Sequence, residues 1–308
     1  MLGRKISPKT FDLAVVGHIV FDHISHHGRR FKTQLGSPCV YASLSARALD
    51  ASVVVGSKVG ADLKKDKLRL LTDAGVDTNH VQRSAGPSTA FKIDYQDGVR
   101  RMWTNARCQA LTIEDVAELP QSKSLHLGPI LNEIPQNVAL FLTERDQIAS
   151  LDAQGYMRQT LRNGRIRRVR WRNRRLLTRL DVLKVSRNEA AVLFGGSFSA
   201  RKLSKLGPKV ILITKAGAGT TVWSRDEGFF EAPAFKTQVR DPTGSGDALV
   251  GGMLVTWART SDLLWAVAVG SAVASFVVEK VSPKKFGTAT QIHKRASTIF
   301  DSTRKLRS

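Results

Sequence analysis

Short apolar runs alternate along the chain with stretches in which apolar residues recur at helical spacing. The runs predict buried strands at residues 11–20, 51–55, 124–127, 148–152, 182–185 and 210–214. The helical spacing predicts helices at 39–49, 62–74, 189–194, 248–258 and 263–278, and Pro135 is expected to open another. Strands that alternate with helices predict an α/β protein whose mostly parallel sheet carries helices on both faces.

One part of the chain breaks this alternation. Two strand-like runs within residues 86–107 flank Asp97-Gly98, a dipeptide typical of tight hairpin turns. Residues 23–35 are rich in histidine, glycine and basic side chains. We expect 23–35 and 86–107 to form one small β-lid inserted into a single domain, 1–308. Residues 220–231 predict a further hairpin.

Length and composition set broad limits on the class of protein. The 308 residues are 42% hydrophobic, which is enough for a packed core. Two cysteines suggest no disulfide framework. The first ten residues are polar and basic, unlike a signal peptide. The longest uncharged stretch, 263–278, is shorter than the roughly 20 residues of a membrane helix. We therefore expect a cytoplasmic protein with no membrane partner.

The charge is strongly basic, with a formal net charge of +22. Ten arginines lie between Arg158 and Arg179, and Trp171 is the only aromatic residue among them. We interpret this segment as a solvated basic face that binds polyanions nonspecifically at low salt. No specific nucleic acid partner is expected, and the sequence leaves open whether the protein is a monomer or a homodimer.

The most informative motif is residues 241–252, Asp-Pro-Thr-Gly-Ser-Gly-Asp-Ala-Leu-Val-Gly-Gly. The first N–H groups of a helix have no partner within the helix and can bind phosphate. Small residues at this position let the phosphate approach these groups closely. Gly244, Ser245 and Gly246 are predicted to supply such N–H groups. Asp247 is the candidate general base for an attacking hydroxyl, and its position near a helix N-terminus predicts an ionised carboxylate. A phosphate-binding helix N-terminus with a candidate general base beside it indicates phosphoryl transfer.

The same motif resembles the C-terminal signature of the PfkB (ribokinase-like) family of carbohydrate and nucleoside kinases. Pro242, Ser245 and Leu249 depart from that signature, whereas both glycines and both acids match it. Leu151 to Gly155 is similar to a segment of archaeal-type members. The resemblance implies a ribokinase-like three-layer fold with a small β-lid, and ATP and Mg²⁺ as cofactors.

Further matches follow in the family's order and imply an acceptor site. Asp22, in Gly-His-Ile-Val-Phe-Asp, falls at the position of the family's substrate-binding acid. Gly36 and Ser37 replace a Gly-Gly pair whose backbone meets the substrate. Glu133 falls where members place a sugar-facing glutamate. Tyr41 stands where ribokinases usually have Asn, which argues against free ribose as the acceptor.

The resemblance also implies a nucleotide site. Ser186 and Glu189 occupy the positions of the family's Asn-x-x-Glu motif, and Glu189 is expected to organise Mg²⁺ through water. Thr214, Gly217 and Gly219 resemble the Thr-x-Gly-x-x-Gly motif that shapes the nucleotide pocket, with Ala216 as a departure. Some relatives hold a monovalent cation near the position of Asp241.

Together these features predict a kinase that transfers the γ-phosphoryl group of ATP to an alcohol of a sugar, nucleoside or cyclitol. Two alternatives remain open at this stage. The departures at Ser37, Tyr41, Ser186 and Ala216 also fit a ligand-binding or regulatory protein that has lost catalysis. The arginine-rich segment also fits a polyanion binder.

Overall fold

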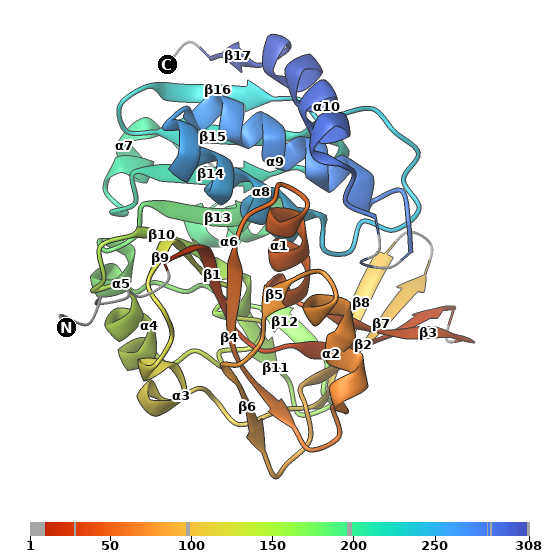
Figure 1. Ribbon diagram of the computed structural model, residues 1–308. Coiled ribbons are helices and arrows are strands. Elements are labelled where there is room, and N and C mark those ends of the chain that lie inside the picture. The colour runs from red at the N-terminus through yellow and green to blue at the C-terminus, as the bar shows by residue number, and fades with distance from the viewer. Residues whose placement is uncertain are drawn as a thin grey trace, which may run out of the picture.

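The computed structural model describes residues 10–27, 29–96, 99–195, 199–281, 283 and 285–306. An eleven-stranded sheet forms its centre (Figure 1). Its parallel part has the order β4 (Val53–Gly60), β1 (Phe11–Val16), β9 (Ser122–Leu127), β10 (Ile148–Asp152), β13 (Val182–Ser186), β14 (Val210–Thr214). One edge continues antiparallel through β15 (Thr220–Ser224), β16 (Gly228–Ala232) and β17 (Arg304–Lys305). The other edge carries the short strands β5 (Val76–Asp77) and β6 (Val81–Ser84), both parallel to β4.

Helices cover both faces of this sheet. The sequence of β1 requires this, because its apolar residues point alternately to the two faces. Leu13 and Val15 belong to one core cluster, whereas Ala14 and Val16 belong to another. The first cluster is shared with α1 (Pro38–Arg47), α2 (Lys65–Thr72), α8 (Ser245–Thr260), α9 (Leu263–Val277) and α10 (Ala289–Asp301). The second is shared with α3 (Ile113–Ala117), α4 (Gln136–Leu142), α5 (Arg174–Leu177), α6 (Arg187–Phe194) and α7 (Ala200–Ser204). The expected three-layer α/β fold is therefore confirmed.

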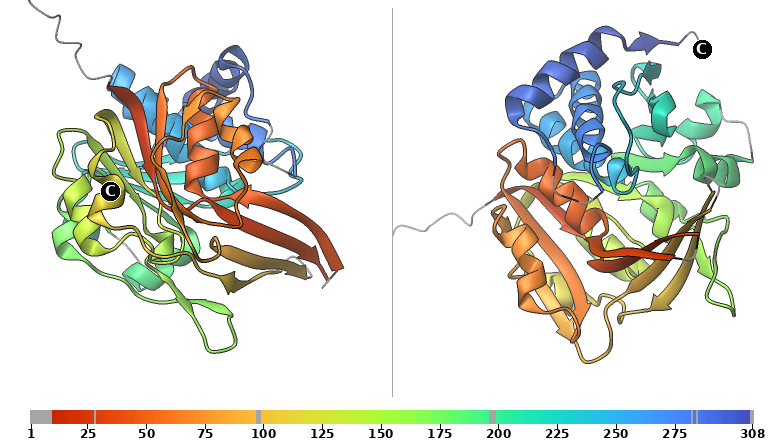
Figure 2. Two further views of the ribbon diagram at one scale, coloured as in Figure 1. Left: turned by 60° about the horizontal axis from the view of Figure 1, so that its bottom comes forward. Right: turned by 90° about the vertical axis from the view of Figure 1, so that its right-hand side faces the viewer.

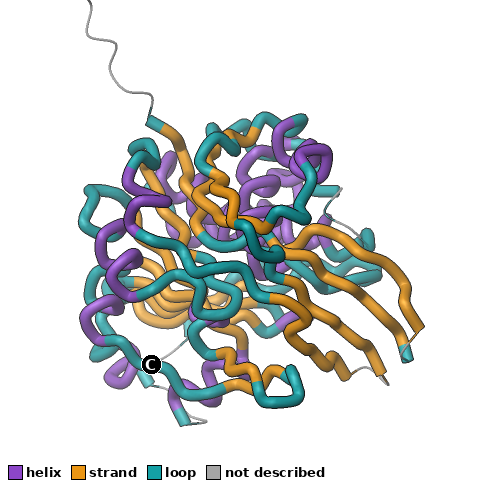
Figure 3. Tube along the Cα trace, turned by 90° about the horizontal axis from the view of Figure 1, so that it is seen from below, coloured by secondary structure: helices purple, strands orange, loops and turns teal. Residues whose placement is uncertain are grey.

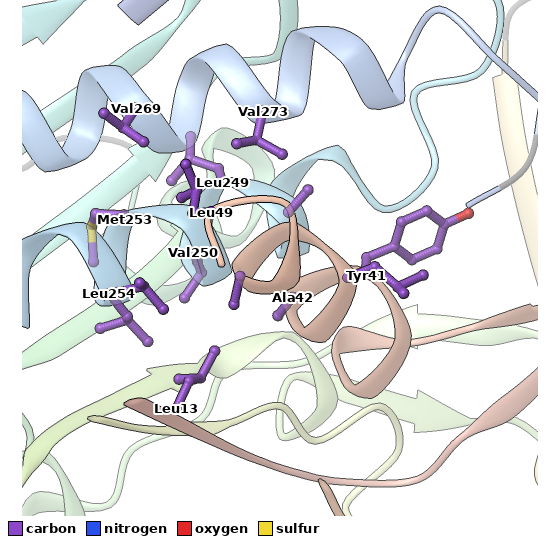
Figure 4. Packing of buried hydrophobic residues seen from close by; sticks show 14 of the residues in the cluster. Leu13, Tyr41, Ala42, Leu49, Leu249, Val250, Met253, Leu254, Val269 and Val273 are labelled. Carbon is purple, nitrogen blue, oxygen red and sulfur yellow. The ribbon is translucent and has the colours of Figure 1, made fainter. Parts of the chain in front are cut away.

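Close packing of α8 against α1 sets the position of the phosphate motif. Val250 and Leu254 of α8 lie beside Ala42 and Leu13 in the core (Figure 4). A Cβ at Gly251 would lie 2.2 Å from the carbonyl oxygen of Ala42. Only glycine allows the two backbones to approach this closely, so the motif's second pair of small residues fixes α8 onto α1.

A second, four-stranded sheet projects from the body (Figures 2 and 3). Its order is β3 (Arg29–Gly36), β2 (Val20–His26), β7 (Ala90–Gln96), β8 (Val99–Ala106). Its strands come from the two segments expected to form the lid, although the Asp97-Gly98 turn lies outside the described residues. A hairpin of β11 (Arg158–Thr160) and β12 (Ile166–Arg168) adjoins β8, where the Thr104 N–H donates to the Gly164 carbonyl at 2.9 Å.

One expectation needs correction. The single strand predicted at 11–20 is divided, because the buried ring of His18 bonds to Thr89 and to the Gln109 carbonyl where the chain passes between the sheets. The arginine-rich segment is largely exposed, as expected for a solvated basic face, and it contains the β11–β12 hairpin. Arg158 departs from this pattern, because its side chain bonds to the Ile130 carbonyl and to Gln154. In the described part of the chain, no helix is long and apolar enough to cross a membrane.

Candidate active site

The glycine-rich turn opens α8 at the carboxyl end of the parallel strands. Gly244 caps the helix with φ 78°, a left-handed conformation, and a Cβ there would lie 2.3 Å from the ring of Tyr41. The Tyr41 ring therefore packs directly against the turn. The Ser245 N–H already donates to the Pro242 carbonyl at 3.3 Å, as does its hydroxyl at 2.9 Å. Among the described residues, no backbone bond is found for the N–H groups of Gly246 and Asp247, so these two best fit an anion hole.

Asp247 lies in the first turn of α8. Burial raises the pKa of its carboxyl from 3.8 to about 7, and Lys184 and Arg158 only partly oppose this shift. The helix N-terminus alone suggests an ionised carboxylate, whereas burial first, and then repulsion from the acids Asp152 and Asp22, raise the pKa of Asp247 and so oppose that ionisation. A carboxyl with a pKa near neutrality is better suited to accept a proton than an ordinary aspartate.

This pKa predicts a pH dependence. If Asp247 accepts the hydroxyl proton, kcat/KM should rise with pH and level off above about 7, because only the ionised form acts as a base. Steady-state kinetics from about pH 5.5 to about pH 9 with saturating donor would measure this profile. A profile that is already flat at the acidic end of that range would contradict the assignment.

A buried ion pair lies beside the turn. Lys184, near the end of β13, donates to Asp152, at the end of β10, at 2.7 Å, and both side chains are at most 7% exposed. A Cβ at Gly246 would lie 2.9 Å from the Lys184 ammonium. Burial disfavours the charge of Lys184, but the neighbouring acids raise its pKa above the usual value. Lys184 therefore places a fixed positive charge next to the predicted anion hole.

Arg158 adds a second cation. Its guanidinium donates to the Ile130 carbonyl at 3.2 Å and to Gln154 at 2.7 Å, which fixes its orientation. Its charge acts on Asp22 and Asp247 and opposes the rise in the pKa of each. Sequence reasoning missed Lys184 and assigned Arg158 to a surface, because nothing in a run of arginines marks the one that turns inward.

The predicted acceptor residues gather where β2 and β3 meet the body. Asp22 faces Gln34 across the two strands, and a Cβ at Gly36 would lie 2.2 Å from the Asp22 carboxylate. Burial raises the pKa of Asp22 to about 6, although Arg100 and Arg158 oppose the shift. Ser37, the N-cap of α1, has φ 105° and a buried hydroxyl.

Two buried, unpaired side-chain oxygens lie in this corner. Among the described residues, the Ser37 hydroxyl and the side-chain carbonyl of Gln34 are buried without a hydrogen-bond partner. The Gln34 amide donates to the Tyr41 hydroxyl at 3.3 Å, which leaves its carbonyl oxygen to accept. Buried polar groups normally have partners, so these atoms are candidates to receive the hydroxyl groups of a ligand.

Glu133 has a different environment from the one expected. Its carboxylate is 1% exposed and accepts the backbone N–H groups of His18, Ile130 and Leu131 at 2.6–3.2 Å. These bonds favour a role in holding the loop after β9 rather than direct contact with a sugar. Contact with the substrate stays a prediction.

The predicted nucleotide residues lie at the ends of β13 and β14. Ser186 and Glu189 form a capping box on α6, in which the Glu189 carboxylate accepts the Ser186 N–H at 2.7 Å. Burial opposes its ionisation, but Lys184 and this bond hold the pKa of Glu189 below its usual value. A Cβ at Gly217 would meet nothing within 4 Å, whereas one at Gly219 would lie 2.1 Å from the Ala232 carbonyl. Gly219 is thus required by its own turn, and Gly217 faces open space next to Thr214.

The second sheet contacts the phosphate motif. The Tyr95 hydroxyl on β7 lies 3.2 Å from the Thr243 hydroxyl in the turn before α8. Asp241 is buried, and its carboxylate accepts the Thr243 N–H at 2.9 Å. Any movement of this sheet would therefore act directly on the turn.

The arrangement fits one class of enzyme, an α/β phosphotransferase, because the predicted acceptor residues and the predicted phosphate turn lie together at the carboxyl edge of a parallel sheet. Comparison with known proteins agrees. Residues 11–288 match the pfkB family carbohydrate kinase model, so the chain belongs to this family and is a kinase that acts on an alcohol.

Individual relatives support the same assignment. The chain is 27% identical over 282 residues to a cytidine kinase of Thermococcus kodakarensis, covering 87% of this chain and 96% of the relative. Two solved structures share the fold. A sulfate complex of a pyrophosphate-dependent kinase in the ribokinase family has a TM-score of 0.80 at 24% identity and covers 88% and 96% of the two chains. Arabidopsis thaliana ribokinase with ribose and ATP has a TM-score of 0.75 at 18% identity and covers 94% and 99%.

Proposed function

We propose that this enzyme transfers the γ-phosphoryl group of ATP to a hydroxyl of a nucleoside, sugar or cyclitol, with Asp247 as general base. The observation that carries the proposal is the position of Asp247 in the first turn of α8, within electrostatic reach of both Asp22 and Lys184. A hydroxyl held at Asp22 and a phosphate held at the turn meet at this carboxylate. Holding both reactants in place supplies much of the catalysis of phosphoryl transfer.

The donor phosphates are assigned to the cation-rich side of the turn. The Gly246 and Asp247 N–H groups and the Lys184 ammonium stabilise the transferring group. Mg²⁺ fits this site as a phosphate-bound ion: no group of three or more candidate protein ligands occurs among the described residues, and Mg²⁺ keeps several waters. Glu189 would hold it through water, and the ion would neutralise charge on the phosphates.

The acceptor is assigned to Asp22, Gln34 and Ser37. The carboxylate and the unpaired Gln34 carbonyl each accept a hydroxyl hydrogen, which suits a ligand with neighbouring hydroxyl groups. Since the T. kodakarensis relative is a cytidine kinase, a nucleoside that presents its ribose hydroxyls is the first candidate. Closure of the four-stranded sheet would exclude water, which otherwise competes as acceptor.

The retained site argues against a protein that has lost catalysis. Tyr41 departs from the ribokinase pattern, yet its ring supports Gly244. Ser186 departs as well, yet it completes the capping box that orients Glu189. Tyr41 and Ser186 therefore both support the local structure of the predicted site.

A panel assay tests the proposal. Donor consumption would be measured for nucleosides, sugars, sugar phosphates and inositols, once with Mg·ATP and once with Mg·pyrophosphate. Turnover with ATP and a nucleoside is the expected result. Turnover with pyrophosphate alone would overturn the assigned donor, and ATP binding without turnover of any acceptor would favour the regulatory alternative.

Asp22→Asn is expected to raise the KM for the acceptor by roughly 10- to 100-fold, because a hydrogen bond to a charged group contributes about 1.5–3 kcal/mol. The KM for ATP should stay unchanged, which serves as the internal control. Equal effects on both constants would point to a damaged fold rather than to a lost acceptor contact.

A further inference from the structure

A cavity of about 470 Å³ lies between α5, the end of α6 and α7. Five cationic side chains line it: Arg170, Arg172, Arg174, Lys202 and Lys205. Leu177, Phe194 and Leu206 line the remainder, so the cavity combines positive charge with apolar surface.

This cavity is distinct from the active site. α5 leads into the amino end of β13 and α7 into the amino end of β14, whereas the active site lies at the carboxyl ends of these strands. In Figure 1, α5 and α7 are at the left of the sheet and the four-stranded lid sheet is at the right. A Cβ at Gly207 would lie 2.8 Å from the Leu177 carbonyl, so the two walls are in direct backbone contact.

The local sequence presents three arginines to one side. Arg170, Arg172 and Arg174 alternate with residues that anchor the segment to the body. The Trp171 ring stacks on Tyr156 at 4.9 Å, and the Asn173 side chain caps α5 by accepting the Leu176 N–H at 3.1 Å. With Trp171 stacked on Tyr156 and Asn173 bonded to α5, the three guanidinium groups line the cavity.

Among the residues that the structure describes, no acid lines this cavity. Within the part of the chain that the structure describes, Arg170, Arg172, Arg174 and Lys205 take part in no ion pair. Residues 158–209 as a whole hold sixteen Lys and Arg against two acids. Such a cluster of like charges repels itself and attracts a ligand that carries several negative charges.

We propose that this cavity is a second site, which binds single-stranded nucleic acid through its phosphates. A volume of about 470 Å³ admits one nucleotide and its apolar lining suits a base or sugar, whereas a duplex could not enter. The arginines continue beyond the cavity on the β11–β12 hairpin, where Arg162, Arg165 and Arg167 are exposed. Cations that extend beyond the cavity suit a polynucleotide better than a mononucleotide. Binding depends on phosphates, so the base sequence is not read.

The test measures binding of fluorescent RNA and DNA strands of about 20 nucleotides, at several salt concentrations, to the full chain and to Arg170→Gln/Arg172→Gln/Arg174→Gln. Each phosphate contact to a single strand contributes about 0.7 to the slope of log K against log salt. The triple variant should therefore lose roughly 2 from that slope and at least about tenfold in affinity at low salt. Its kinase activity should equal that of the wild type.

The matched control is Lys64→Gln/Lys65→Gln/Lys67→Gln, which removes three exposed charges near α2. Equal loss in the control would show that binding depends on net charge and would overturn the site. Equal affinity for duplex DNA, or equal competition by inorganic polyphosphate at the same phosphate concentration, would overturn the assignment to a single strand. A difference between the RNA and DNA strands would support the site and identify which of them it prefers.

Discussion

Asp247→Asn is expected to lower kcat by roughly two to four orders of magnitude, the usual contribution of a positioned general base. Asparagine has nearly the same size and lacks only the ionisable oxygen, and Gly244 rather than Asp247 caps the helix, so the fold and the binding of ATP should persist. Turnover would be measured by ADP release with the best acceptor, and ATP affinity by calorimetry.

The matched control is Asp66→Asn, which makes the same change at an exposed acid in the first turn of α2. It should leave turnover unchanged. If Asp247→Asn retained wild-type kcat, the hydroxyl proton would have to leave by another route and the assigned base would be wrong.

The same variant has a second consequence for stability. Burial raises the pKa of Asp247 to about 7, so the folded state favours the protonated carboxyl. The wild type then loses stability as pH rises from about 4 through 7, because the unfolded chain releases this proton more readily. Asp247→Asn removes that loss. Its Tm relative to wild type should therefore increase from about pH 5 to about pH 8, as expected where catalysis is favoured over stability.

The sequence predicted the layered fold because apolar periodicity directly reflects burial. Strands at 148–152 and 210–214 match the structure, and the motif at 241–252 lies at the start of α8 as expected. These predictions depend on local patterns that the fold leaves unchanged. Close packing against Tyr41 and Ala42 requires glycine at 244 and 251, which the sequence did not predict, and the role of the motif's glycines at a phosphate stays a prediction.

Residues that act across the sheet could not be predicted in this way. Lys184 meets Asp152 only because β13 and β10 are neighbours, and no spacing along the chain records that pairing. Gln34 lies opposite Asp22 because of the register between β3 and β2. The bonds from the Ile130 and Leu131 N–H groups to Glu133 were likewise not predictable, and its contact with the substrate stays a prediction of the resemblance.

Lys184→Met is the second variant with a large expected effect. It leaves the buried Asp152 carboxylate without its partner, which typically costs about 3–5 kcal/mol of unfolding free energy. It also removes a fixed donor beside the turn, and loss of such a donor lowers turnover by roughly 100- to 1000-fold. Denaturant unfolding and steady-state kinetics would measure the two effects.

A paired variant separates stability from catalysis. In Lys184→Met/Asp152→Asn the buried charge is gone, while the introduced asparagine side chain can still accept the Gln154 N–H that Asp152 accepts at 3.0 Å in the wild type. Replacing both members of a buried pair is often neutral for stability. The unfolding free energy should therefore recover and turnover should not. Recovery of turnover along with stability would show that the lysine acts only through the fold.

The pH profile gives an independent readout of the same pair. Lys184 lowers the pKa of Asp247 and Asp152 raises it. The single variant should therefore shift the rise of kcat/KM to higher pH, and the paired variant should return it toward the wild-type position. A merely structural lysine would move neither profile, because its loss would change the amount of folded enzyme and not the charge felt by Asp247.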